Sequence, residues 1–323
     1  ILLMLLSVEV VDILIVLVGI SLLPLFIDTL NTFIPVGRLV HKYVSLLLVS
    51  VLVVLYACSL YYFFTLIIPF YLGSSSSLSI QDFRSLQNIY HWSTAIHWNE
   101  LTIKDTIIII MGSIFALWLW CNTIYSYIST IIHSPTYDTL EPTSKQDGKR
   151  YCNICKIIKE KQTHHCSQCG KCIPNMDHHC PFTANCVSTG KDGNFTYFFM
   201  FISYTSAGSA YAALTMIIPF YRCYWEQELS ERCVSVGSMS LIFIPGVILF
   251  FVTTGFTLLH VFLIIFGKST LEFIHWIDKK RGKTAPVNMD KEHENLKNLT
   301  KLHCSILEFL FPYIFMKNKH KRE

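Results

Sequence analysis

The chain has 323 residues, of which 52% are hydrophobic, 14% are aromatic and only 15% are charged. Soluble globular proteins usually carry about 25% charged residues, and disordered chains are rich in charge and poor in apolar residues. The composition therefore excludes both classes and predicts an integral membrane protein. The formal net charge of +4 does not indicate a nucleic-acid partner, because membrane orientation accounts for the basic residues.

Five segments are long and apolar enough to cross a bilayer as helices, which takes roughly 20 mostly apolar residues. They cover residues 10–30, 44–70, 105–132, 195–219 and 240–266. The first segment has Glu9 and Asp12 at its entry and is interrupted by Pro24, so a signal sequence is its alternative interpretation. The fold class predicted is an all-α polytopic membrane protein with about five transmembrane helices.

Lysine and arginine are enriched in the cytosolic loops of membrane proteins. With five spans, residues 31–43, 133–194 and 267–323 lie on one face and hold 22 of the 26 basic residues, so this face is predicted to be the cytosol. The expected organisation is 1–43, an N-terminal span and linker; 44–132, two spans with a lumenal loop; 133–194, a cytosolic cysteine-rich domain; 195–266, two spans; and 267–323, a cytosolic tail. Cys223 and Cys233 then face the lumen, where the sequence leaves a disulfide between them open.

Seven of the twelve cysteines fall between Cys152 and Cys186. Disulfides are rare in the reducing cytosol, so a dense group of cysteines and histidines there indicates a metal site or a catalytic site. The C-x2-C spacings typical of tetrahedral zinc sites are formed by Cys152 with Cys155 and by Cys166, Cys169 and Cys172. The alternative, a set of reduced structural cysteines, is disfavoured because the segment has too little apolar material to fold without the energy that zinc supplies.

The segment holds more candidate metal ligands than two zinc sites need. The segment holds seven cysteines and four histidines, and two closed zinc sites use about eight ligands. If His164 is one of the three that remain, a nearby histidine and a nearby cysteine are free to react. No internal repeat of fixed period is predicted.

The segment from Cys152 to Cys186 has the pattern C-x2-C-x9-H-C-x2-C-x2-C-x4-D-H-H-C-x5-C. It resembles the cysteine-rich domain of the DHHC-type protein S-acyltransferases, or palmitoyltransferases, which likewise lies between two spans. The resemblance implies a four-span core, to which residues 10–30 are an addition. It also implies two interleaved structural zinc sites, one formed by Cys152, Cys155, His165 and Cys172 and the other by Cys166, Cys169, His179 and Cys186.

Further family marks extend the resemblance to roughly residues 105–312. Thr270 and Glu272 belong to a run, Ser269-Thr270-Leu271-Glu272, that resembles the family's T-T-x-E motif with serine for the first threonine. Asn295 resembles the asparagine of the family's C-terminal motif. These three residues are expected to be structural.

The Asp177-His178-His179-Cys180 run contains the groups that a cysteine nucleophile needs. A thiol with a pKa of about 8.5 is only a few per cent thiolate at neutral pH, and the thiolate is the nucleophile. An imidazole can take the proton, and a carboxylate can fix the tautomer of the imidazole. We assign Cys180 as the nucleophile, His178 as the general base and Asp177 as the group that orients it. The alternative is that Cys180 is a ninth zinc ligand or an inert thiol.

By resemblance, Cys180 takes a long-chain acyl group, typically palmitoyl, from acyl-CoA and passes it to a cysteine of a membrane-associated substrate protein. The acyl chain is expected to lie in the bilayer among the spans, near Phe182, Phe199 and Phe201. Two departures from the family pattern are Phe182, where tryptophan is usual, and a longer gap after Cys186. Other interpretations are a zinc-stabilised membrane scaffold without activity and a membrane RING-type ubiquitin ligase, whose zinc spacing differs.

The tail carries two further sequence patterns. From Asn295 the leucines recur at helical spacing, which predicts an amphipathic helix on the cytosolic face. Lys319-His320-Lys321-Arg322-Glu323 resembles the dilysine retrieval signal of the endoplasmic reticulum, with the Golgi as the alternative location. Asn194 and Asn298 lie in glycosylation patterns but are expected to be unmodified, because both face the cytosol.

Overall fold

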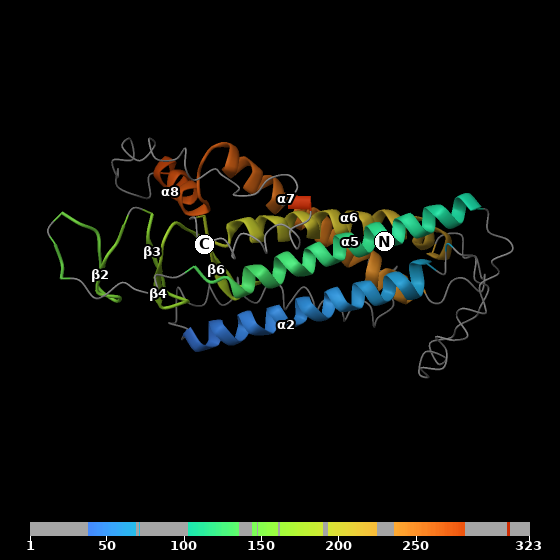
Figure 1. Cartoon of the computed structure of the whole chain (residues 1–323), viewed down its shortest axis with the longest axis horizontal. Coiled ribbons are helices and arrows are strands. Elements are labelled where there is room, and N and C mark those ends of the chain that lie inside the picture. Colours follow the sequence, from blue (N-terminus) through green and yellow to red (C-terminus); the bar gives the residue numbers. More distant parts are fainter. Residues whose placement is uncertain are drawn as a thin grey trace, which may run out of the picture. The chain divides into compact units, whose positions relative to one another are not determined.

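The structure, a computed structural model, describes residues 38–68, 71, 103–135, 144–146, 148–160, 162–189, 193–224, 236–281 and 309–310. Figure 1 labels the larger helices and several of the strands, and its colours follow the chain. Several predictions lie outside the described residues: the span at 10–30, Asn295 and the tail helix that follows it, Asn298, the lysines at 319 and 321, and the disulfide between Cys223 and Cys233, whose side chains are not described.

Four helices in the described part of the chain are long and apolar enough to cross a membrane. The helices are α2 (Arg38–Tyr62), which continues as a π-helical turn, η2 (Phe63–Ile67), then α5 (Ile103–Ile132), α6 (Phe195–Tyr224) and α7 (Val236–Ile265), and a shorter helix, α8 (Thr270–Lys280), follows them. Their apolar stretches, Lys42–Tyr62, Ile103–Ile132, Phe195–Tyr221 and Phe243–Ile265, confirm four of the five predicted spans. Ile107, Ile108 and Met111 of α5 are each more than half exposed, as expected of side chains that contact lipid.

The described residues within Val53–Cys121 and Tyr204–Thr253 form one of two compact units. Its helices are joined by hydrogen bonds between polar groups in the apolar spans. The hydroxyls of Tyr56 and Thr205 lie 2.9 Å apart, and the Tyr211 hydroxyl donates to the carbonyl of Gly112 at 2.9 Å. A Cβ at position 112 would lie 2.8 Å from the Tyr211 oxygen, so a larger residue there would displace the Tyr211 hydroxyl, whereas glycine lets it approach the backbone.

The second unit comprises the described residues within Leu22–Leu52, Asn122–Ser203 and Thr254–Glu323, and it holds the cysteine-rich segment. Here the chain forms three two-stranded antiparallel sheets rather than helices. The strands are β1 (Tyr151–Cys152), β2 (Ile157–Ile158), β3 (His164–Cys166), β4 (Lys171–Ile173), β5 (Met176–Cys180) and β6 (Asn185–Ser188). We did not predict them, because strands of two to five residues are too short to show an alternating pattern.

The three hairpins are repeats of one another, so the prediction that the chain has no internal repeat is wrong. Cys152, Cys166 and Cys180 end the first strands at intervals of 14 residues. They pair with Ile157, Lys171 and Asn185 across turns of the same length. The last residue of each turn has a positive φ: Lys156 (57°), Gly170 (69°) and Ala184 (50°). One supersecondary unit therefore occurs three times in this segment.

The hairpins have little apolar core of their own. Apart from cysteines, the apolar side chains buried there are Ile157, Ile173, Met176 and Val187. The first three belong to two core clusters that otherwise consist of cysteines, with Leu271 of α8 packed at the side. So small a core cannot offset the conformational entropy of ordering the segment. This supports the prediction that bound metal supplies the folding energy.

Two buried asparagines tie the third hairpin to the C-terminal end of α5. The Asn185 amide donates to the carbonyls of Thr130, Ile131 and His133 at 3.0–3.2 Å and so helps to satisfy the carbonyl groups at the end of the helix. The Asn194 amide donates to the carbonyls of Thr130 and Cys186, and its oxygen accepts the N–H of Ser188. Asn194 is fully buried, and that it carries no glycan stays a prediction.

Replacing Asn194 with aspartate is expected to lower the free energy of unfolding by about 3 kcal/mol or more. The change removes two donors and buries a carboxylate against two carbonyl oxygens. The midpoint of thermal unfolding in detergent micelles measures the effect. Gln146→Glu is the matched control, because it makes the same amide-to-acid change at an exposed side chain. A midpoint shift no larger than that of the control would contradict the role given to Asn194.

Candidate active site and zinc-binding clusters

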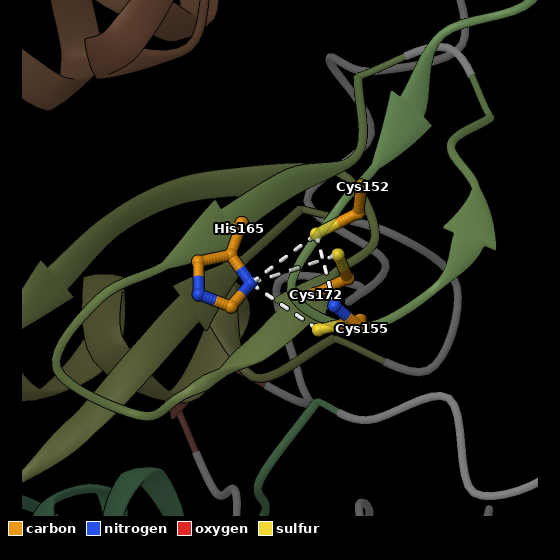
Figure 2. Close-up of side chains that lie close together, drawn as sticks. All are labelled: Cys152, Cys155, His165 and Cys172. Carbon is orange, nitrogen blue, oxygen red and sulfur yellow. Dashed lines mark hydrogen bonds between the residues drawn. The ribbon is translucent and has the colours of Figure 1, made fainter.

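The first cluster of metal-ligating side chains consists of Cys152, Cys155, His165 and Cys172. Nδ1 of His165 lies 3.6, 3.2 and 3.9 Å from the sulfur atoms of Cys152, Cys155 and Cys172. Figure 2 shows the three sulfur atoms turned toward this one ring nitrogen. The cluster joins two hairpins, because Cys152 ends β1 and Cys155 lies in the turn that follows it, whereas His165 and Cys172 are partners across β3 and β4.

The second cluster repeats this arrangement one hairpin further along the chain. It consists of Cys166, Cys169, His179 and Cys186, with Nδ1 of His179 at 3.5–3.6 Å from the three sulfur atoms. Cys166 ends β3 and Cys169 lies in the turn that follows it, and His179 and Cys186 are partners across β5 and β6. Each cluster thus takes a C-x2-C turn from one hairpin and a cross-strand pair from the next.

Both clusters fit zinc. Tetrahedral zinc, with Zn–S of about 2.3 Å and Zn–N of about 2.0 Å, holds its ligand atoms about 3.5–3.8 Å apart. The sulfur–nitrogen distances of 3.2–3.9 Å agree with this spacing. The backbone N–H groups of Cys155 and Cys169 donate to the sulfurs of Cys152 and Cys166 at 3.4 and 3.3 Å, and such bonds stabilise thiolates. Four protein ligands close each site, so zinc here has a structural role.

The repeat explains why Cys180 is left over. Cys180 stands where Cys152 and Cys166 stand in the first two hairpins, but Thr183 replaces the second cysteine of the turn. A fourth hairpin would be needed to supply a cross-strand pair. Among the residues that the structure describes, Cys180 belongs to neither cluster.

A β-bulge assembles the proposed catalytic residues. His178 and Cys180 are two residues apart on β5, so they point to one face of the strand and His179 points to the other, toward the zinc cluster. In a regular strand Asp177 would share the face of His179. The register shifts between Met176 and His178, so Asp177 is an extra residue, and its side chain turns back to His178. Oδ2 of Asp177 lies 2.8 Å from Nδ1 of His178.

The electrostatics of the three residues favour a thiolate beside an imidazolium. Burial lowers the pKa of His178, but hydrogen bonds and charge interactions with Asp177 and Cys180 outweigh burial and raise that pKa to about 9. Burial raises the pKa of Cys180, but His178 and hydrogen bonds from Thr183 bring it below its usual value. Burial also raises the pKa of Asp177, and hydrogen bonds from His178 and Thr270 lower it overall.

The T-T-x-E-like motif holds Asp177 from outside the hairpins. The backbone N–H of Thr270 donates to Oδ1 of Asp177 at 2.9 Å, and its hydroxyl donates to Oδ2 at 2.7 Å. Thr270 is the first residue of α8, which Ser269 and Glu272 cap. The N–H of Ser269 donates to the Glu272 carboxylate and the N–H of Glu272 donates to the Ser269 hydroxyl, which is a capping box. Serine in place of the motif's first threonine therefore keeps the hydroxyl that the cap needs.

The three phenylalanines expected near the acyl chain do not form one group. Tyr127 of α5 links two of them, since its hydroxyl donates to the carbonyl of Phe182 at 2.8 Å and its ring lies 4.7 Å from that of Phe201. The ring of Phe199 lies instead 6.2 Å from that of Phe309. Phe199 and Phe201 are two residues apart on α6, which turns them to different faces of the helix.

Sequence reasoning missed one residue beside this site. His260 of α7 lies with Nε2 4.0 Å from Oδ2 of Asp177, and its ring centroid is 6.0 Å from that of His178. Asp177, His178 and His260 bring their ligand atoms within 4.8 Å of one another. The sequence signal was a histidine inside an apolar span, which is rare and usually functional.

Comparisons with known proteins agree with this geometry. Residues 145–277 match the model of the DHHC palmitoyltransferase family. The chain is 33% identical over 132 residues to probable protein S-acyltransferase 13 of Arabidopsis thaliana, which covers 40% of this chain and 42% of that protein. It is 32% identical over 130 residues to palmitoyltransferase ZDHHC20 of Homo sapiens, an alignment that covers 40% of this chain and 34% of that protein. It is 35% identical over 136 residues to palmitoyltransferase ZDHHC2 of Rattus norvegicus, an alignment that covers 40% of this chain and 36% of that protein.

The matched part spans less than half the length of each of these relatives. It includes both zinc-binding clusters, the Asp177-His178-His179-Cys180 run and the capped start of α8. These features and the family match confirm the resemblance seen in the sequence. Residues 145–277 therefore match the DHHC palmitoyltransferase family in sequence and in the arrangement of their metal-ligating side chains.

Proposed function

We propose that the protein transfers a long-chain acyl group, palmitoyl in the first instance, from acyl-CoA to cysteine thiols of membrane-associated proteins. The observation that carries the proposal is the position of Cys180. It follows His179, a ligand of the second cluster, on β5 and yet belongs to neither cluster. It also shares one face of β5 with His178, which lowers the pKa of the Cys180 thiol and whose ring is oriented by the buried carboxylate of Asp177. That arrangement suits a nucleophile better than a metal ligand.

The reaction would run in two stages. His178 takes the proton of the Cys180 thiol, and the thiolate attacks the carbonyl carbon of the acyl-CoA thioester. The bond between this carbon and the CoA sulfur breaks, and the CoA thiolate takes the proton from His178. The acceptor cysteine then gives its proton to His178, and its thiolate attacks the carbonyl carbon of the acyl group on Cys180. The bond between this carbon and the Cys180 sulfur breaks, and the Cys180 thiolate takes the proton back from His178. One thioester replaces another at each stage, so no ATP is needed.

The bilayer and the charge pattern support the remaining parts of the proposal. A sixteen-carbon chain partitions into hydrocarbon at about 0.8 kcal/mol per buried CH₂, so it can lie among the spans. Because Tyr127 links Phe182 and Phe201 whereas Phe199 lies on another face of α6 beside Phe309, a single chain would contact the first two or Phe199. The distribution of lysine and arginine supports a cytosolic location for residues 133–194 and 267–323. The lysines at 319 and 321 support the endoplasmic reticulum, with the Golgi second, as the membrane.

Purified protein incubated with labelled palmitoyl-CoA is expected to carry a hydroxylamine-sensitive label, which Cys180→Ser abolishes. Cys121→Ser is the matched control, because Cys121 is an exposed free thiol on α5 outside both clusters, and it is expected to keep the label. Zinc content should be the same in all three proteins. If neither the wild type nor the control is labelled although zinc is retained, the proposal fails and a zinc-stabilised scaffold is favoured.

A further inference from the structure

An ionisable side chain lies at the end of the last span, beside the proposed catalytic residues. The His260 side chain is only 5% exposed, and its ring packs against Phe198 and Phe195 with centroids 5.2 and 6.0 Å away. Ionisable residues in membrane spans are costly, and they usually mark a function with a nearby partner. The polar group that His260 approaches is the carboxylate of Asp177.

The hydrogen bond on the other side of the ring fixes its tautomer. Nδ1 of His260 lies 2.9 Å from the carbonyl oxygen of Phe256, which can only accept, so Nδ1 carries the proton. In the neutral ring Nε2 then has a bare lone pair. Among the residues that the structure describes, this buried nitrogen has no hydrogen-bond partner, and Oδ2 of Asp177 lies 4.0 Å from it.

Two acceptors that face each other in a buried site need a donor between them. The Asp177 carboxylate accepts three hydrogen bonds, two from Thr270 and one from His178, and a carboxylate can accept about four. A separation of 4.0 Å is too long for a direct hydrogen bond. It suits a water molecule that lies about 2.8 Å from each acceptor and donates one O–H to each.

We propose that His260 is a positioning residue that holds Asp177 from the membrane span α7 through a bridging water molecule. The Asp177 carboxylate is then held by residues of three elements: Thr270 of α8, His178 of β5 and His260 of α7. Without His260 the carboxylate is free to turn away from His178, and the base is no longer aligned with Cys180. The inference rests on the proposed function, because it explains how the proposed base is oriented.

Three substitutions of His260 separate this role from simple packing. Phenylalanine keeps the ring, asparagine places an amide near Nδ1, and glutamine places one near Nε2. His260→Phe and His260→Asn are expected to lower the single-turnover rate of Cys180 acylation about tenfold to a hundredfold, the effect of losing a hydrogen bond to a charged group. His260→Gln is expected to stay within about threefold of the wild type. Zinc content should not change.

A double-mutant cycle with Asp177→Asn tests whether His260 affects the acylation rate through Asp177. If His260 acts through Asp177, His260→Phe changes the rate by less than about twofold in the Asp177→Asn background. An equal loss in both backgrounds would overturn the proposal, as would a wild-type rate for His260→Phe or equal losses for glutamine and asparagine.

The same comparison is made with the rate at which iodoacetamide alkylates Cys180, measured by mass spectrometry. Alkylation needs an activated Cys180 thiol but no acyl-CoA, so it is expected to follow the pattern described for acylation across the His260 variants. Wild-type protein that is alkylated but never acylated would refute the proposed function, and the alkylation rates alone would then decide the role of His260. If the wild-type protein is acylated but the His260 substitutions change neither the acylation rate nor the alkylation rate, the role of His260 is refuted and the proposed function stands.

Discussion

Asp177→Asn is expected to lower the rate of Cys180 acylation by about three to four orders of magnitude, the scale known for the same change in an Asp-His-nucleophile triad. Asp177 is 1% exposed, and Oδ2 accepts from both His178 and Thr270. If the asparagine oxygen takes the place of Oδ2, it still accepts from His178 and the Thr270 hydroxyl. Its NH₂ group then faces the backbone N–H of Thr270, so that two donors oppose each other. Otherwise the NH₂ group faces His178 and favours the tautomer whose proton points at Cys180, which cannot act as a base.

The single-turnover rate with labelled palmitoyl-CoA measures this effect. Asp105→Asn is the matched control, because it makes the same change in the first turn of α5, at a residue that is not part of the proposed site, and it should keep the wild-type rate. Both variants are expected to bind two zinc ions, since Asp177 belongs to neither zinc-binding cluster. A rate for Asp177→Asn within tenfold of the wild type would show that Asp177 does not orient the base.

Much of the architecture could be predicted because membrane spans leave a strong signal in the sequence. A helix such as α5 needs an apolar stretch of about 20 residues, and such stretches are rare by chance. The ligand sets could be predicted only through the resemblance, since C-x2-C spacing gives the donors but not which pairs share an ion. The structure supplies the reason for the interleaving: His165 with Cys172, and His179 with Cys186, are cross-strand partners.

The parts that could not be predicted depend on contacts that leave little local pattern. The β-bulge at Asp177 inserts one residue into β5, and nothing in the neighbouring residue types specifies it. His260 meets Asp177 across more than eighty positions of sequence, so only the fold brings them together. The 14-residue repeat was visible in Cys152, Cys166 and Cys180, but Thr183 in place of a third paired cysteine interrupts it.

Cys186→Ser is expected to reduce bound zinc from two ions per chain to one and to abolish acylation of Cys180. Cys186 is fully buried and pairs across the third hairpin with His179, so the loss of its thiolate opens the second zinc-binding cluster. Structural zinc supplies about 10–16 kcal/mol in small zinc-binding peptides, more than the few buried apolar side chains of these hairpins can replace. The hairpin that loses its zinc is the one that carries Cys180 and His178.

Zinc per chain is measured by elemental analysis of the purified protein, and acylation by the labelled substrate. Cys180→Ser is the matched control for zinc, because it makes the same change in the same hairpin, at a cysteine outside both clusters. It is expected to keep two ions while it loses the label, whereas Cys186→Ser loses one ion as well. If Cys180→Ser loses an ion and Cys186→Ser retains two, the ligand assignment is wrong, and Cys180 is bound to metal rather than free to attack an acyl group.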